Sequence, residues 1–178
     1  MRKILPILTL AFASFFIYSC DNNDDEVVQI EDQDTYGIAY DINNANFTRI
    51  NSTLYQYTNE FVDPLVESDV VLIYMQTGTS NNSPVWKLMP YTFYVNNAND
   101  DNIEYTFDFS KFDIAINVNS TPTLNLDSNP TYYSGKRFRV VVVPAKTGKN
   151  ASAAVDHNDY NAVIKFYGID ESKIKVKN

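Results

Sequence analysis

The chain has 178 residues, of which 44% are hydrophobic and 20% are charged, and its formal net charge is −8. These values are typical of a globular protein with one domain, and they argue against wholesale disorder and against a polytopic membrane protein. Its five glycines are too widely spaced for a Gly-rich phosphate loop. With one cysteine and one histidine, zinc sites of Cys and His ligands and Cys/His or Ser/His/Asp catalysis are close to excluded. We therefore expect no cofactor and no enzymatic activity.

The N-terminus has the pattern of a signal peptide. Arg2 and Lys3 form a short positive region, and residues 4–19 form an uncharged apolar run that ends directly at Cys20. This run is short for a membrane-spanning helix, which takes about 20 residues. The small residue Ser19 before the only cysteine makes this ending resemble a bacterial lipobox.

The lipobox resemblance implies that the peptide is cut before Cys20 and that this cysteine is acylated. Several acyl chains on one residue hold a domain stably to a membrane. We therefore predict a signal peptide at 1–19 and a lipid anchor at Cys20. The alternative is that Cys20 is an ordinary residue of an uncleaved or conventionally cleaved segment. Because no other cysteine exists, no disulfide can form within the mature chain.

Residues 20–34 are predicted to form an acidic, flexible tether, because they are rich in Asp and Glu and have too little apolar surface to fold. Acidic residues just after the lipidated cysteine also resemble the surface-export signal of Bacteroidota lipoproteins, whereas an Asp beside the cysteine implies inner-membrane retention in enterobacteria. A composition rich in Asn and Tyr favours the first group. We expect a lipid-anchored protein of the outer membrane that is exposed on the cell surface.

Charge is distributed unevenly along the chain. Residues 21–69 hold 12 acids and one base, whereas residues 70–178 hold 10 acids and 11 bases. The nearly neutral body argues against nucleic acid as a partner. Lys136, Arg137 and Arg139 do cluster, but they open a strongly apolar strand, and we interpret them as a solvated strand edge.

Residues 35–178 are predicted to form a single domain, an antiparallel β-sandwich of immunoglobulin-like type with seven or eight strands. Alternation of apolar and polar residues is clearest at 103–109. Residues 70–75 and 140–143 are apolar on both faces, which predicts central strands. Pro90 must lie at an edge or a bend, because it cannot donate a ladder hydrogen bond. The expected strands are 36–42, a hairpin at 47–57, 70–75, 85–89, 91–95, 103–109, 112–118 and 140–143.

One late segment breaks with the strand pattern. Apolar residues recur at helical spacing from Tyr160, capping candidates precede them and Gly168 ends the run, which predicts a helix over 158–167. His157 is interpreted as part of the loop that enters this helix rather than as a catalytic base. The alternation of apolar residues and lysines at 173–177 predicts an edge strand.

Five segments of the body resemble, in this order, a group of small uncharacterised lipoproteins of flavobacteria and other Bacteroidota. Many members carry a collagen-like Gly-Pro segment after the lipidated cysteine, where this chain has the acidic tether. Some members carry an automatic dihydrolipoamide dehydrogenase name. That enzyme needs a flavin-binding Gly-rich loop, a redox Cys pair and a His base, and a mature chain with one lipidated cysteine does not supply this set. The resemblance therefore implies fold and location only. The segments are 69–78, 85–95, 105–110, 137–145 and 159–169.

One predicted loop concentrates oxygen ligands as a calcium site requires. Asn99, Asp100, Asp101 and Glu104 are the candidate ligands, within residues 96–104. The loop lacks the glycine and the ligand spacing of an EF-hand, so a plain hairpin loop is the alternative.

A set of aromatic residues is the second candidate site. Trp86, Tyr132 and Tyr133, together with Tyr91 and Phe93, are candidates for a platform on which a sugar ring stacks. Tyr132 and Tyr133 follow a turn signal and are expected to be the better exposed. The alternative is that Trp86 on a strand belongs to the core.

Three hypotheses for function remain. The leading one is a non-enzymatic interaction or structural module of the cell envelope, with an unidentified envelope protein or glycan as partner. The second is a carbohydrate-binding accessory lipoprotein, which requires exposed aromatic rings. The third, a glycoside-acting enzyme, requires two carboxylates about 5–10 Å apart across a pocket. Asp108 and Asp113 are interpreted as solvated residues instead.

Overall fold

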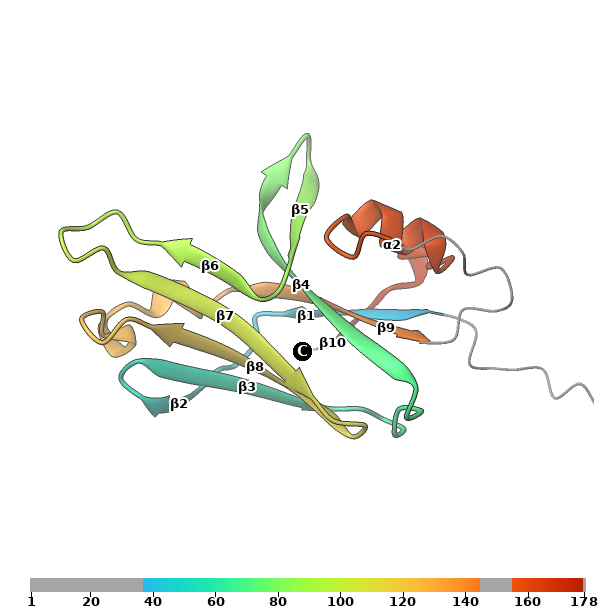
Figure 1. The fold of residues 1–178 in the computed structure, drawn as a ribbon, viewed down its shortest axis with the longest axis horizontal. Coiled ribbons are helices and arrows are strands. Elements are labelled where there is room, and N and C mark those ends of the chain that lie inside the picture. Colours follow the sequence, from blue (N-terminus) through green and yellow to red (C-terminus); the bar gives the residue numbers. More distant parts are fainter. Residues whose placement is uncertain (1–36, 145–154, 178) are drawn as a thin grey trace, which may run out of the picture. The chain divides into compact units, whose positions relative to one another are not determined.

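The computed structural model describes residues 37–144 and 155–177 (Figure 1). The signal peptide at 1–19, Cys20 and the tether at 20–34 lie outside these residues, so their roles stay predictions. The described part of the chain contains ten strands in two five-stranded sheets and one short α-helix. The predicted all-β sandwich with a short C-terminal helix is confirmed. None of the described helices is long and apolar enough to cross a membrane.

The first sheet has the strand order β10-β1-β9-β4-β5. Its neighbouring strands are antiparallel except β10, which joins β1 in parallel as the predicted edge strand. Its strands are β1 (Ile38–Asn43), β4 (Asp69–Ser80), β5 (Ser83–Leu88), β9 (Arg137–Pro144) and β10 (Lys175–Lys177).

The second sheet has the strand order β2-β3-β8-β7-β6 and is antiparallel throughout. The hairpin expected at 47–57 supplies two of its strands, and the lysine-rich tail adds one to the first sheet, so ten strands form instead of seven or eight. Its strands are β2 (Thr48–Asn51), β3 (Leu54–Glu60), β6 (Tyr91–Tyr94), β7 (Asn102–Phe109) and β8 (Asp113–Ser120).

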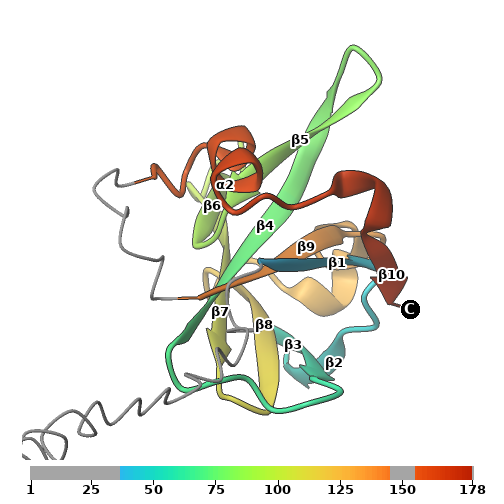
Figure 2. The same cartoon turned by 90° about the vertical axis from the view of Figure 1, so that its right-hand side faces the viewer.

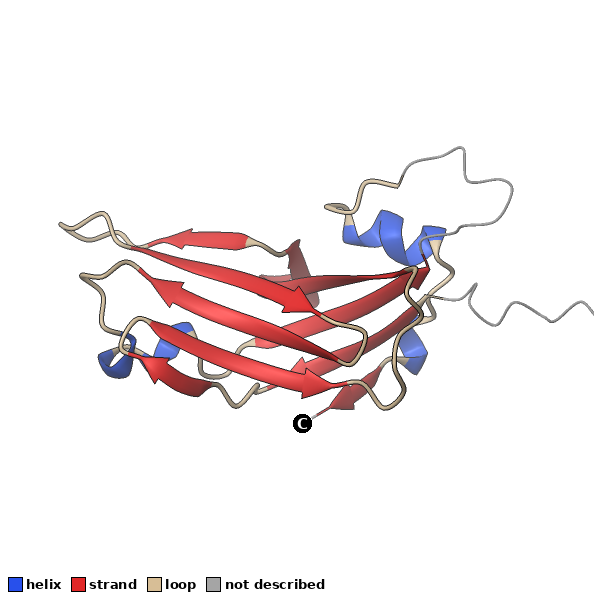
Figure 3. Cartoon of the chain, turned by 60° about the horizontal axis from the view of Figure 1, so that its bottom comes forward, coloured by secondary structure: helices blue, strands red, loops and turns tan. Residues whose placement is uncertain are grey.

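The main core lies between the two sheets, which face each other in Figure 3. The first sheet contributes Ile73 and Phe138, and the second contributes Ile114 and Ile116, all fully buried. Each side chain of this size that leaves water stabilises the fold by roughly 1.5–3 kcal/mol. The alternation seen in the sequence at 103–109 therefore reflects one face packed on this core and one facing solvent.

The other face of the first sheet is covered by α2 (Tyr160–Phe166), as Figure 2 shows. Tyr160 and Val163 of the helix pack on Tyr74 of β4 and Val141 of β9. Strands β4 and β9 are thus buried on both faces, which is why the sequence is apolar without alternation at both of them. The predicted central position of these strands is confirmed.

The helix predicted over 158–167 is confirmed, with slightly shorter bounds. The carboxylate of Asp159 accepts a hydrogen bond from the backbone N–H of Ala162 at 3.1 Å and so caps the first turn. Gly168 follows the helix with φ of +63°, a left-handed conformation that favours glycine. His157 lies in the turn before the helix, and its carbonyl oxygen accepts a hydrogen bond from Tyr74 at 2.8 Å.

Pro90 marks the point where the chain passes from one sheet to the other. It follows β5, the outermost strand of the first sheet, and precedes β6, the outermost strand of the second. The predicted bend at Pro90 is confirmed, and the Met89–Pro90 peptide bond is cis. Because β5 and β6 are not paired with each other, the two sheets are not closed by hydrogen bonds along this side.

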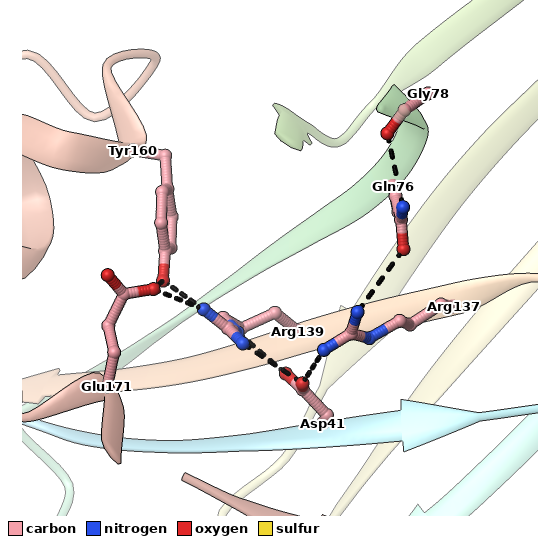
Figure 4. A network of polar contacts seen from close by, with 7 residues as sticks. All are labelled: Asp41, Gln76, Gly78, Arg137, Arg139, Tyr160 and Glu171. Carbon is pink, nitrogen blue, oxygen red and sulfur yellow. Dashed lines mark hydrogen bonds and ion pairs between the residues drawn. The ribbon is translucent and has the colours of Figure 1, made fainter. Parts of the chain in front are cut away.

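A buried ionic network joins the central strands to the helix layer (Figure 4). Arg139 of β9 is only 5% exposed, and its Nε and Nη2 donate to the two carboxylate oxygens of Asp41 on β1 at 2.6 and 3.0 Å. Its Nη1 donates to Glu171 at 2.7 Å, and the Tyr160 hydroxyl donates to the same carboxylate at 2.6 Å. Arg137 also pairs with Asp41, at 2.5 Å. The network thus connects β1, β9, α2 and the 3-10 helix η4 (Glu171–Lys173).

The interpretation of Lys136, Arg137 and Arg139 as a solvated strand edge is wrong. β9 is the middle strand of its sheet, and Arg139 points into the layer covered by α2. The guanidinium remains charged in this position because Asp41 and Glu171 supply paired carboxylates.

Charge at Asp41 is maintained by its arginine partners. Burial raises the pKa of the Asp41 carboxyl, but hydrogen bonds from Arg139 and Arg137 outweigh this effect and hold the pKa below its usual range. Because the folded-state pKa is depressed, this carboxylate stabilises the fold at pH values above its unfolded pKa, about 3.9.

Replacement of Asp41 by Asn should reduce the free energy of unfolding by about 3–5 kcal/mol, because it leaves the buried Arg139 guanidinium without its main carboxylate partner. Urea denaturation measures this loss. Arg49→Ala is the matched control, because the Arg49–Asp127 salt bridge at 2.8 Å is exposed and its removal should cost far less. Equal losses in the two variants would contradict a stabilising role that depends on burial.

The difference in stability between the wild type and Asp41→Asn should also depend on pH. It should be constant from about pH 7 to 5 and shrink as the pH falls below about 4, because Asp41 of the unfolded wild type then binds a proton while the depressed pKa keeps Asp41 of the folded protein ionised to lower pH. Thermal unfolding of both proteins across this range gives the difference directly. A difference that does not change down to about pH 2 would show that the ionised form of Asp41 contributes nothing.

Candidate functional site

A cleft of about 310 Å³ opens between the two sheets on the side where β5 and β6 diverge. Its volume falls at the lower end of the range of ligand pockets, roughly 300–1,000 Å³. This cleft is the candidate site, and we call it the inter-sheet cleft. It is lined by Met75, Gln76, Thr77, Tyr91, Phe93, Tyr105, Thr131, Tyr132 and Lys136.

The cleft exists because β4 leaves the sandwich partway along its length. The register of β4 against β5 shifts between Gln76 and Gly78, and the hairpin of these two strands rises away from the second sheet beyond that point (Figures 1 and 2). Strand β6 stays with the second sheet, beside β7. The space between the bent β4 and the edge strand β6 is the mouth of the cleft.

Aromatic rings form most of the apolar wall. The rings of Phe93 and Tyr132 lie 6.1 Å apart and tilted, and those of Tyr91 and Tyr105 lie 6.3 Å apart and nearly parallel. The buried Tyr105 hydroxyl donates a hydrogen bond to the carbonyl oxygen of Tyr132 at 2.7 Å, which ties the short 3-10 helix η3 (Pro130–Tyr132) to β7. Phe93 is 44% exposed, so one ring is open to a ligand.

Among the described residues of the cleft lining, Lys136 is the only charged one. It is half-buried and lies between η3 and β9, where Gly135 takes φ of +67° to turn the chain. The backbone N–H of Ser134 donates to the carbonyl of Pro130 at 2.7 Å and closes the same turn. Burial lowers the pKa of the Lys136 ammonium. The turn therefore places a partly desolvated cation in the lining that also holds the aromatic rings.

The groups of this lining can contact a ligand in several ways. Aromatic faces stack on flat or ring-shaped ligands. Hydroxyl groups of Thr131 and Tyr91 and the ammonium of Lys136 can hydrogen-bond to polar substituents. The lining residues that the structure describes include no Asp, Glu or His, so they offer no carboxylate pair for glycoside hydrolysis.

A second cavity, of about 560 Å³, lies beside α2 between the β4–β5 hairpin and the helix. Its charged groups already serve the fold, because Asp159 caps α2 and Glu171 pairs with Arg139. Trp86 at its base packs against the guanidinium carbon of Arg139 at 4.6 Å and is buried. The carboxylates of this cavity are therefore engaged within the fold.

The structure does not bring all the aromatic candidates together. Tyr132 lines the inter-sheet cleft, as do Tyr91 and Phe93. Trp86 lies on the opposite face of the first sheet, under α2, in agreement with the core alternative. Tyr133 turns toward the core and stacks on Tyr55 with ring centres 4.0 Å apart.

The calcium candidates do not converge either. Asp101 is 1% exposed, and its carboxylate accepts hydrogen bonds from Asn97 at 2.8 Å, from Thr121 at 2.5 Å and from Thr123. These hydrogen bonds hold its pKa below the usual range. Asn99 and Asp100 are exposed in the loop, and Glu104 is exposed on β7. The part of the chain that the structure describes holds no group of three or more Asp, Glu, His or Cys suited to a metal.

The loop around Asp101 is instead a structural hairpin connection. The carboxylate ties the loop after β6 to Thr121 and Thr123, which follow β8. The carboxylates of Asp108 and Asp113 are exposed on β7 and β8 and line neither of the two cavities described above.

The sequence alone did not single out Lys136 or Gln76 as site residues. The turn signal at Ser134-Gly135 predicted that Lys136 begins a strand. Lys136 lines a cleft only because the two sheets diverge beside it, and the local sequence does not show this divergence. Comparison of the chain with family models, curated proteins and solved structures gives no match.

Proposed function

We propose that the chain is a membrane-anchored lipoprotein that acts without catalysis, as a binding module of the cell envelope, and that the inter-sheet cleft holds its ligand. The observation that carries this proposal is the composition of the cleft. Aromatic rings, hydroxyl groups and one ammonium converge there, and the described lining residues include no carboxylate. Such a lining can bind and orient a ligand, and it lacks the carboxylate pair that glycoside hydrolysis uses.

The anchor is proposed from the sequence. Acyl chains on Cys20 would hold the protein in the outer membrane, and residues 21–36 would separate the anchor from the described domain. A chain of this length spans at most roughly 55 Å when fully extended. Such reach would let the cleft approach ligands beyond the membrane surface. The acidic residues after Cys20 support display on the cell surface, and the resemblance to Bacteroidota lipoproteins supports the same location.

Carbohydrate binding is the more specific candidate. Sugar rings carry apolar C–H faces and polar hydroxyl rims, and Phe93 and Tyr132 present aromatic faces beside the hydroxyl groups of the cleft. The size of the cleft suits a single ring rather than a long flat polymer face.

The anchor and location are tested by fractionation and proteinase treatment of intact cells. The wild type should stay with the outer membrane and be degraded from outside, whereas Cys20→Ala should be released or remain unprocessed. A variant with Asp24→Asn, Asp25→Asn and Glu26→Gln should stay membrane-bound but become protected from the proteinase. If Cys20→Ala behaves as the wild type, the protein is not a lipoprotein. If the wild type is protected, it does not face outward.

The binding role is tested with a glycan array that carries neutral and acidic glycans, probed with the full chain solubilised in detergent. Phe93→Ala should weaken binding of the retained glycan by about tenfold, because it removes an exposed ring of the cleft. Phe112→Ala is the matched control, since Phe112 is 56% exposed but lies in the turn between β7 and β8, away from the cleft lining. Equal losses in both variants, or no retained glycan, would contradict carbohydrate binding in the cleft.

A further inference from the structure

Lys136 stands out among the more buried cations of the domain. Arg137 and Arg139, which follow it on β9, are both paired with the carboxylate of Asp41. Lys136 is half-buried, like Arg137, yet it forms no salt bridge with any residue of 37–144 or 155–177. Its ammonium therefore loses part of its hydration in the cleft without gaining a carboxylate partner.

Such an arrangement is unfavourable for the fold taken alone. A charge that is partly removed from water costs free energy unless a group of opposite charge or several hydrogen bonds compensate it. Within residues 37–144 and 155–177, the other residues that line the cleft are all neutral. An anionic group on a ligand would provide the missing partner.

The surroundings of Lys136 indicate what else the ligand must carry. Phe93 and Tyr132 offer ring faces, and Thr131 and Tyr91 offer hydroxyl groups. A ligand that satisfies all of them has an apolar ring face, hydroxyl groups on its rim and a negative charge at one edge. The acidity of the chain lies mainly in residues 21–69, so the residues that form the cleft do not oppose an anion.

We infer that the inter-sheet cleft binds a pyranose ring that bears a carboxylate, with the ring against Phe93 and Tyr132 and the carboxylate paired with the Lys136 ammonium. This inference rests on the proposed binding function and names the ligand class of the same site. Hexuronic acids in acidic polysaccharides have this chemistry.

Titration calorimetry with trigalacturonate and with its neutral methyl ester tests the inference on the full chain in detergent. The acid should bind about 10- to 100-fold more tightly than the ester, the range for a hydrogen bond between charged groups. Lys136→Met should abolish this preference while it leaves the melting temperature unchanged or higher, because no salt bridge is lost. Lys136→Arg should retain the preference, since it keeps the charge.

Two outcomes would overturn the inference. Equal binding of the acid and the ester, or a preference that survives in Lys136→Met, would show that Lys136 does not select a carboxylate, while binding itself would still support the proposed function. No binding of either probe would also reject an acidic pyranose as the ligand. The glycan array with Phe93→Ala and Phe112→Ala then decides separately whether the cleft binds any other glycan.

Discussion

The ion pair between Arg139 and Asp41 determines how the layers of the domain fit together. It places a guanidinium on the middle strand of the first sheet, in a layer that α2 covers, and it requires a carboxylate from β1 at 2.6 Å. The two residues are 98 positions apart in the sequence. Buried pairs add little net stability over apolar residues of the same shape, but a missing partner is costly. The pair therefore favours the pairing of β1 with β9. The salt bridge between Arg139 and Glu171 also holds the C-terminal segment against the same sheet.

The inter-sheet cleft follows from the same division of the chain into layers. The first sheet is held on its outer face by α2 and on its inner face by the second sheet. On the side of β5 and β6 no strand pairing joins the two sheets, and the bend in β4 leaves room between them. The groups that line this space come from strands and from the short turn of η3, which Tyr105 anchors by a hydrogen bond. These elements determine where the groups that line the cleft lie.

Much of the fold could be predicted from local patterns, because the spacing of apolar residues along a strand indicates whether one or both of its faces are buried. Alternation indicated β7, and the unbroken apolar run at 140–143 indicated a strand covered on both faces. The environment of Arg139 could not be predicted in this way, because its partner Asp41 lies far away in the sequence and charged residues are usually exposed. The site was predicted only in part for a similar reason. Tyr132 and Tyr133 are neighbours in the sequence, yet one lines the cleft and the other stacks in the core, and the path of the chain through the 3-10 helix η3 determines which.

The proposed role of the inter-sheet cleft in ligand binding is tested most directly by NMR of the full chain in detergent during titration with trigalacturonate. The Met75 methyl group and the Phe93 and Tyr132 ring signals should shift, because these residues line the cleft. The indole signal of Trp86, the only tryptophan, should stay in place, because it lies under α2 on the other face of the first sheet. Shifts at Trp86 without shifts at Met75 would place binding in the cavity beside α2 and would contradict the inter-sheet cleft as the ligand site.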